Sequence, residues 1–113
     1  MERKIKKYER LLTNLLSNYI QEHSPRKDFN YLLITDTKNH HFQVIRNGWD
    51  DDLLIHQLIF HFEVKADCKI WLWVNQTDID VGQVLSLQGV PNSDIVLGFF
   101  PPYMREWSDY AVA

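Results

Sequence analysis

The chain has 113 residues, of which 45% are hydrophobic and 24% are charged, a composition typical of a globular protein. This length predicts one domain spanning residues 1–113, with a core that needs neither a metal nor a disulfide. Cys68 is the one cysteine and cannot form an internal disulfide. The sequence has no apolar run of membrane-spanning length, so we expect a cytoplasmic protein with an inert or exposed thiol and no membrane partner.

The net charge of −3 is unevenly distributed along the chain. Residues 1–27 carry seven Lys or Arg against three Glu, a net charge of +4, whereas residues 28–113 carry five against twelve, a net charge of −7. Affinity for nucleic acid depends mainly on neutralising phosphate charge. The acidic composition therefore argues against DNA binding by residues 28–113 and leaves only the basic end as a candidate.

That basic end belongs to a predicted amphipathic helix over residues 2–22, which Pro25 is expected to close. Its apolar residues recur at spacings of three and four: Ile5, Tyr8, Leu12, Leu15 and Tyr19. We expect this stripe to pack on a sheet, with the basic residues in solvent. The alternatives are a partner helix on the stripe or nucleic acid at the basic end. The candidate nucleic-acid contacts are Arg3, Lys4, Lys6, Lys7 and Arg10.

After a polar link over residues 26–30, alternating apolar residues predict four strands. These are residues 31–36, residues 41–46 ended by Asn47–Gly48, residues 53–64, and residues 69–74. Both faces of residues 53–64 are rather apolar, which favours a central strand with the helix over one face. We also expect Trp49 to be buried, so that Trp49→Ala would cost about 3–5 kcal/mol.

Thr77 and Asp80 resemble a capping signal for a short helix that ends near Gly89, followed by a last strand over residues 95–99. The predicted fold class is α+β. It consists of an antiparallel sheet of four or five strands covered by the N-terminal helix, with a short helix before the last strand.

The last residues of the chain are the candidate interaction segment. Pro101–Pro102 stiffens the backbone, and the apolar residues that follow it predict an end folded into the domain rather than frayed. We expect the exposed part of this segment to offer Tyr103, Arg105 and Trp107 to a protein partner, because these residue types dominate interface hot spots. The alternative is that Trp107 and Tyr110 merely seal the core.

Four blocks of this sequence resemble the XisI family over most of the chain from about Tyr31 onward. They are Gly48–Trp49, Lys69–Ile70–Trp71, Gly89–Val90–Pro91, and the run from Asp94 to Phe99 with Pro101–Pro102, Arg105 and Tyr110–Ala113. The resemblance implies an accessory factor that controls excision of the fdxN DNA element in filamentous cyanobacteria, together with a companion XisH protein. A homo-oligomer is an open alternative. Phe100 stands where the family often has a histidine, which weakens an enzymatic interpretation.

Catalytic and metal-binding patterns are weak. Asp50–Asp52 with Glu63 and Lys65 resembles the carboxylates and lysine of magnesium-dependent nucleases. On one extended strand, however, Asp52 and Glu63 would lie about 35 Å apart. His56 and His61 would point to opposite faces of their strand, so they cannot share an ion. We therefore predict no catalytic residue, no metal and no cofactor, and hence a binding protein rather than an enzyme.

Overall fold

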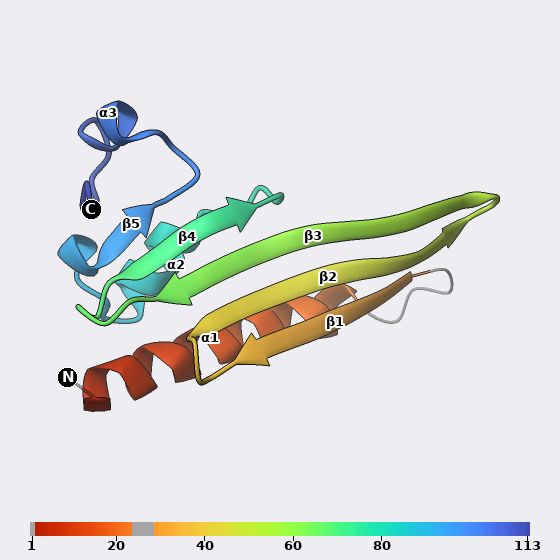
Figure 1. Cartoon of the computed structure of the whole chain (residues 1–113), viewed down its shortest axis with the longest axis horizontal. Coiled ribbons are helices and arrows are strands. Elements are labelled where there is room, and N and C mark those ends of the chain that lie inside the picture. Colours follow the sequence, from red (N-terminus) through yellow and green to blue (C-terminus); the bar gives the residue numbers. More distant parts are fainter. Residues whose placement is uncertain (1, 24–28) are drawn as a thin grey trace.

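The computed structural model describes residues 2–23 and 29–113. A 22-residue helix precedes a five-stranded sheet, and short helices lie before and after the last strand (Figure 1). The elements are α1 Glu2–His23, β1 Phe29–Asp36, β2 His41–Asp50, β3 Leu53–Val64, β4 Ile70–Asn75, α2 Val81–Leu87, the 3₁₀ turn η1 Asn92–Asp94, β5 Ile95–Leu97 and α3 Pro102–Arg105. No helix within the described ranges is both long and apolar enough to span a bilayer.

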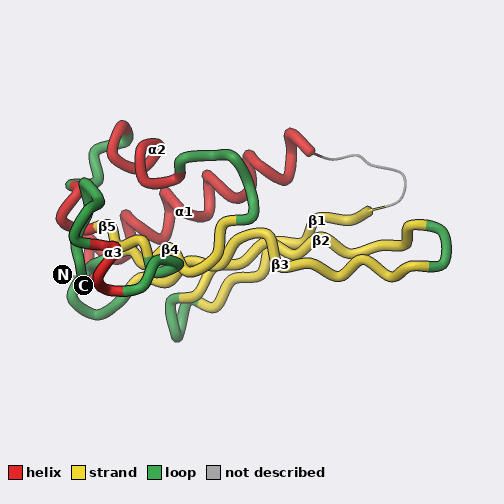
Figure 2. The backbone as a smooth tube through the Cα atoms, turned by 90° about the horizontal axis from the view of Figure 1, so that it is seen from above, coloured by secondary structure: helices red, strands yellow, loops and turns green. Residues whose placement is uncertain are grey.

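The five strands form one open sheet in the order β1-β2-β3-β4-β5, so β3 is central as predicted. Neighbours from β1 to β4 are antiparallel, whereas β5 pairs with β4 in parallel. The parallel pair arises because α2 carries the chain back across the sheet before β5 begins. In Figure 2, α1 and α2 lie on the same side of the sheet. The predicted α+β class is therefore confirmed, with one parallel pair in place of a fully antiparallel sheet.

The core lies between α1 and the sheet. The apolar stripe of α1 is buried there, which confirms that the helix packs on the sheet. The buried residues of α1 are Tyr8, Leu12, Leu16 and Tyr19, and those of the strands include Phe42, Val44, Phe60, Phe62, Val64, Ile70 and Leu72. The helix ends at His23; Ser24 and Pro25, which were expected to close it, lie outside the described residues. Cys68 is buried at a positive φ of 66° in the β3–β4 turn.

The β2–β3 hairpin is longer than predicted. β2 continues through Gly48 to Asp50, so the prediction that Asn47–Gly48 ends the strand was wrong. The chain turns instead at Asp51–Asp52, and Asp51 adopts a positive φ of 51°, a conformation that Asp tolerates better than most residues. The hairpin extends beyond the end of α1 (Figure 2). This extension leaves Trp49 59% exposed, so its predicted burial was also wrong.

The C-terminal half differs from expectation in detail. Asp80 caps α2 by accepting a hydrogen bond from the Gln83 amide at 3.1 Å, so α2 begins at Val81 rather than near Thr77. Gly89 follows α2 with a φ of +97°, as a helix-terminating glycine should. β5 ends at Leu97, two residues earlier than predicted.

Candidate interaction surfaces

The C-terminal segment, residues 98–113, is folded onto the sheet as predicted. The Phe99 amide donates to the carbonyl of Leu72 at 3.1 Å, and the Ala111 amide donates to the carbonyl of Ile95 at 2.8 Å. Ala111 also forms a parallel bridge with Val96, so it extends the sheet past β5. Lys69 Nζ donates to the backbone oxygen of Ala113. The segment is therefore held on the sheet near both of its ends.

The buried side chain of Arg105 holds the C-terminal segment in place. Its Nε donates to the carbonyl of Phe100 at 3.0 Å, and its Nη1 donates to the carbonyl of Val112 at 3.2 Å. The guanidinium carbon lies 4.9 Å from the centre of the Trp71 ring, which is within range of a cation–π interaction. These contacts leave Arg105 only 9% exposed, so the expectation of an exposed arginine was wrong. A partner would therefore contact the segment that Arg105 holds in place, and not the guanidinium group itself.

Tyr110 closes the other end of the segment. A Cβ placed on Gly82 of α2 would lie 2.7 Å from Cζ of Tyr110, so the ring packs directly on the glycine backbone. Burial raises the pKa of Tyr110, and the carboxylates of Asp80 and Asp109 add to the rise. Tyr110 therefore helps to seal the core.

The two remaining candidates on this segment face solvent. Tyr103 is 69% exposed and Trp107 is 87% exposed, whereas the backbone around them is fixed by α3 and Arg105. The alternative that Trp107 seals the core was wrong. Because the backbone is already fixed, binding through these side chains does not carry the entropic cost of ordering a loop. We call Tyr103 and Trp107 the aromatic pair.

The basic end of α1 divides into two groups. Lys4 forms an ion pair with Asp94 at 2.7 Å, and Tyr8 donates a hydrogen bond to the same carboxylate at 2.5 Å. Burial alone would raise the pKa of Asp94, but the hydrogen bonds from Lys4 and Tyr8 outweigh it, so the pKa is lowered. The hydrogen bond to Asp94 correspondingly raises the pKa of Lys4. Lys4 thus joins α1 to η1, directly before β5.

The other four basic residues are exposed. They are Arg3, Lys6, Lys7 and Arg10, and spacings of three and four place them on one side of the helix. That side lies away from the buried stripe, and it is the part of the basic end available to a polyanion.

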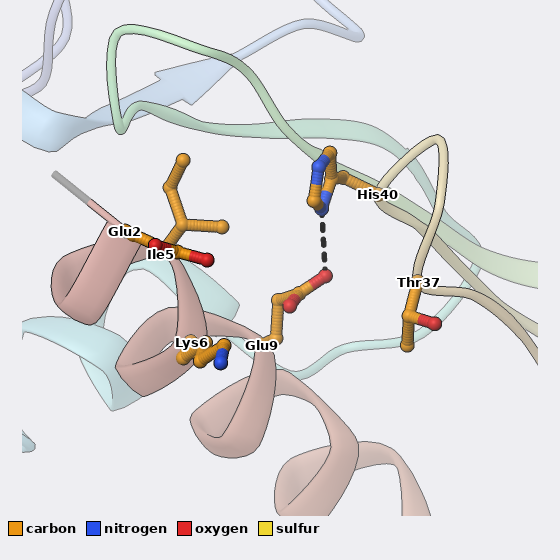
Figure 3. A pocket seen from close by; sticks show the side chains of 6 residues that line it. All are labelled: Glu2, Ile5, Lys6, Glu9, Thr37 and His40. Carbon is orange, nitrogen blue, oxygen red and sulfur yellow. Dashed lines mark hydrogen bonds and ion pairs between the residues drawn. The ribbon is translucent and has the colours of Figure 1, made fainter.

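A hollow of about 460 Å³ lies between the start of α1 and the β1–β2 turn (Figure 3). Glu9 of α1 and His40 of the turn face each other across it, with His40 Nδ1 2.8 Å from Glu9 Oε2. The other lining residues are Glu2, Ile5, Lys6 and Thr37. His40 adopts a positive φ of 62°. The Glu9–His40 contact ties the turn to the helix.

The residues of the nuclease alternative do not converge. β3 runs from Leu53 to Val64, so Asp52, which directly precedes it, and Glu63 lie at opposite ends of the strand. Glu63 accepts a hydrogen bond from Trp73 Nε1 at 2.9 Å, and Lys65 Nζ lies 4.1 Å from the centre of the Trp71 ring. Within residues 2–23 and 29–113, no group of three or more His, Cys, Asp or Glu side chains is placed to hold a metal.

One polar contact was missed from the sequence. His41 Nδ1 and His61 Nε2 lie 2.9 Å apart across β2 and β3, and His41 Nε2 lies 3.9 Å from Glu63. A regular pairing of the two strands would not have found this contact, because the register of β2 with β3 shifts between Val44 and Ile45, and this shift places His61 on the face of His41. Burial lowers the pKa of His61, nearby His41 lowers it further, and Glu63 opposes both.

The same shift in register also affects His56. His56 pairs with Asn47 and His61 pairs with Gln43, so the shift places the two histidines on the same face of the sheet. The prediction that these two histidines point to opposite faces was therefore wrong.

The fold and these surfaces define a small α+β protein whose distinctive features are exposed side chains on a fixed framework. The XisI protein family model matches residues 1–112, and the chain belongs to the XisI family. No curated protein matches it.

Two solved structures from Anabaena variabilis are similar to the whole chain. A XisI-like protein is 39% identical with a TM-score of 0.90, and the match covers 96% of this chain and 99% of that one. The fdxN element excision controlling factor XisI is 23% identical with a TM-score of 0.84, and the match covers 97% of this chain and 99% of that one. The second likeness shows a shared fold.

Proposed function

We propose that this protein is a non-catalytic accessory factor, acting in the cytoplasm, that helps to control site-specific excision of a DNA element by binding a companion XisH-like protein. Membership of the XisI family supports this function, since a solved protein of the same fold is named an fdxN element excision controlling factor. The observation that carries the binding mode is the aromatic pair, exposed on a segment that Arg105 holds in place.

The aromatic pair suits a protein partner better than a nucleic acid. Tyrosine and tryptophan contribute large contact areas at interface hot spots. Stacking on single-stranded bases would need a positive groove beside the rings. The residues that flank Trp107 are Glu106, Ser108 and Asp109, and the nearby arginine is buried. This local charge disfavours phosphate and favours a partner with apolar or basic side chains.

Binding of the purified companion to this protein tests the proposal. Replacing both Tyr103 and Trp107 with Ala should leave folding intact, because both side chains are exposed, and should weaken binding about thirtyfold or more. Trp49→Ala is the matched control, since it removes an equally large exposed ring from the distant hairpin tip. Equal affinity of the double variant and the wild type would rule out the aromatic pair as the binding surface.

A second candidate function is direct DNA binding by the exposed basic stripe of α1. The four exposed basic residues, Arg3, Lys6, Lys7 and Arg10, support it. A gel shift at low salt that disappears with added salt, and that Lys6→Glu with Lys7→Glu abolishes, would establish this function. Lys4 should be left unchanged, because its substitution would also break the contact with Asp94. The absence of any shift at low salt would reject it.

A further inference from the structure

The two edges of the sheet are treated very differently. β5 has only three residues, and Ala111 bridges to it from the C-terminal segment. β1 has eight residues, pairs with β2 on one side and forms the opposite edge (Figure 1). Within the described ranges, no backbone hydrogen bond joins residues 29–36 to anything other than β2. The outward N–H and C=O groups of β1 are thus a template for another strand.

β1 also lacks the devices that usually protect an edge. Its sequence, Phe-Asn-Tyr-Leu-Leu-Ile-Thr-Asp, contains no proline and no lysine. Its pairing with β2 is regular along all eight residues, without a bulge. Leu32 and Ile34 are 43% and 42% exposed on the face that α1 does not cover, whereas Tyr31 and Leu33 pack against the core. This edge is apolar, regular and open.

We propose that the chain forms a twofold-symmetric dimer in which β1 pairs with β1 of a second copy, antiparallel, with Leu33 on the twofold axis. The sheet would become one continuous sheet through both copies. This dimer uses neither the aromatic pair nor the basic stripe, so it is independent of the proposed function.

The register follows from the side-chain pattern. Residues that face each other in an antiparallel pair point to the same side of the sheet. A twofold axis perpendicular to the sheet keeps every side chain on its own side. The axis must therefore pass midway between one residue and the same residue of the second copy. With Leu33 on the axis, Leu32 faces Ile34 of the partner subunit, and Ile34 faces Leu32 of the partner subunit. Asp36, the one charged residue of β1, then faces the amide of Asn30 of the partner subunit. An axis through Leu32 would instead place Ile34 against that amide.

Charge is compatible with a second copy here. Asp36 is already bound by its own turn, because it accepts hydrogen bonds from the Lys38 and Asn39 amides at 3.0 Å each. These hydrogen bonds lower the pKa of Asp36, with Asn39 contributing most. No like charges meet within β1 in this register, so the strand edge adds no repulsion between copies that are acidic overall.

Sedimentation analysis of the full chain over a dilution series tests the dimer. The wild type should approach twice the 13.5 kDa chain mass. Leu32→Lys with Ile34→Lys places lysines opposite each other and should raise the dimer Kd at least about tenfold. Leu32→Lys with Ile34→Glu places opposite charges together in the proposed register. It should dimerise about tenfold more tightly than the two-lysine variant.

Leu53→Lys with Leu54→Lys is the matched control, because it changes two exposed leucines at the hairpin tip and should leave the dimer intact. Circular dichroism should show that all the variants fold. A monomeric wild type, or a dimer that the two-lysine variant leaves unchanged, would overturn the proposal. Equal Kd values for the two β1 variants would overturn the register. If the wild type is monomeric and the β1 variants lose companion binding, the edge serves the companion instead.

Discussion

Arg105→Ala should destabilise this protein far more than a typical surface substitution. Removal of the guanidinium leaves the carbonyls of Phe100 and Val112 without their donors and removes the cation from the Trp71 ring. A hydrogen bond from a charged donor contributes about 1.5 kcal/mol or more, and the ring contact contributes about 1 kcal/mol. Together they give an expected loss of about 3–4 kcal/mol, a large share of the stability of a small domain.

Urea denaturation followed by tryptophan fluorescence measures this loss directly, because Trp71 lies at the site. Arg105→Lys keeps the positive charge, but a single ammonium group cannot bond both carbonyls as the forked guanidinium does. About half of the loss in stability is therefore expected. Arg3→Ala is the control for removing an arginine; Arg3 is exposed on α1, and its loss should cost less than about 0.5 kcal/mol. If Arg105→Ala were as stable as Arg3→Ala, the guanidinium would not hold the segment, and the reasoning would be refuted.

Three further substitutions test other parts of the structure. Trp49→Ala should cost less than about 1 kcal/mol by thermal unfolding, because the ring is exposed, whereas Phe60→Ala in the core should cost about 3–5 kcal/mol; equal losses would contradict this placement. Asp94 has a lowered pKa, so its carboxylate stabilises the fold above pH 3.8 and loses that effect as the pH falls through its folded pKa. The stability advantage over Asp94→Asn should therefore shrink on acidification, and a constant advantage would count against it. Gly82→Ala should lower the unfolding temperature, because the new methyl group would overlap the Tyr110 ring, and smaller Tyr110→Leu should relieve part of that loss; no loss in Gly82→Ala would show that the ring packs elsewhere.

Local patterns predicted the elements well. The three-four spacing of apolar residues located α1, and alternation located β3 with its ends at Leu53 and Val64. The burial of Trp49 could not be predicted in the same way. Alternation indicates the face to which a side chain points, but it does not indicate whether anything covers that face. α1 ends before the hairpin does, and that relation depends on three dimensions.

The sequence predicted where the candidate interaction segment lies, but it did not predict the contacts within that segment. The proline pair and the apolar end correctly indicated a folded C-terminal segment. The role of Arg105 could not be predicted, because its partners include Trp71 of a distant strand and the carbonyl of Val112. Isolated arginine is exposed far more often than buried. The His41–His61 contact similarly required the register of β2 and β3.

Hydrogen exchange at the backbone amides of residues 98–113 tests the central structural claim most directly. The Phe99 amide, bonded to Leu72, and the Ala111 amide, bonded to Ile95, should exchange slowly, at rates approaching those of β4. In the wild type, Trp107 should lie between these two slowly exchanging amides. In Arg105→Ala, both amides should exchange faster. Exchange of both amides at the rate of an unfolded peptide would show that the chain end is not held on the sheet, and the proposed binding surface would then have no fixed framework.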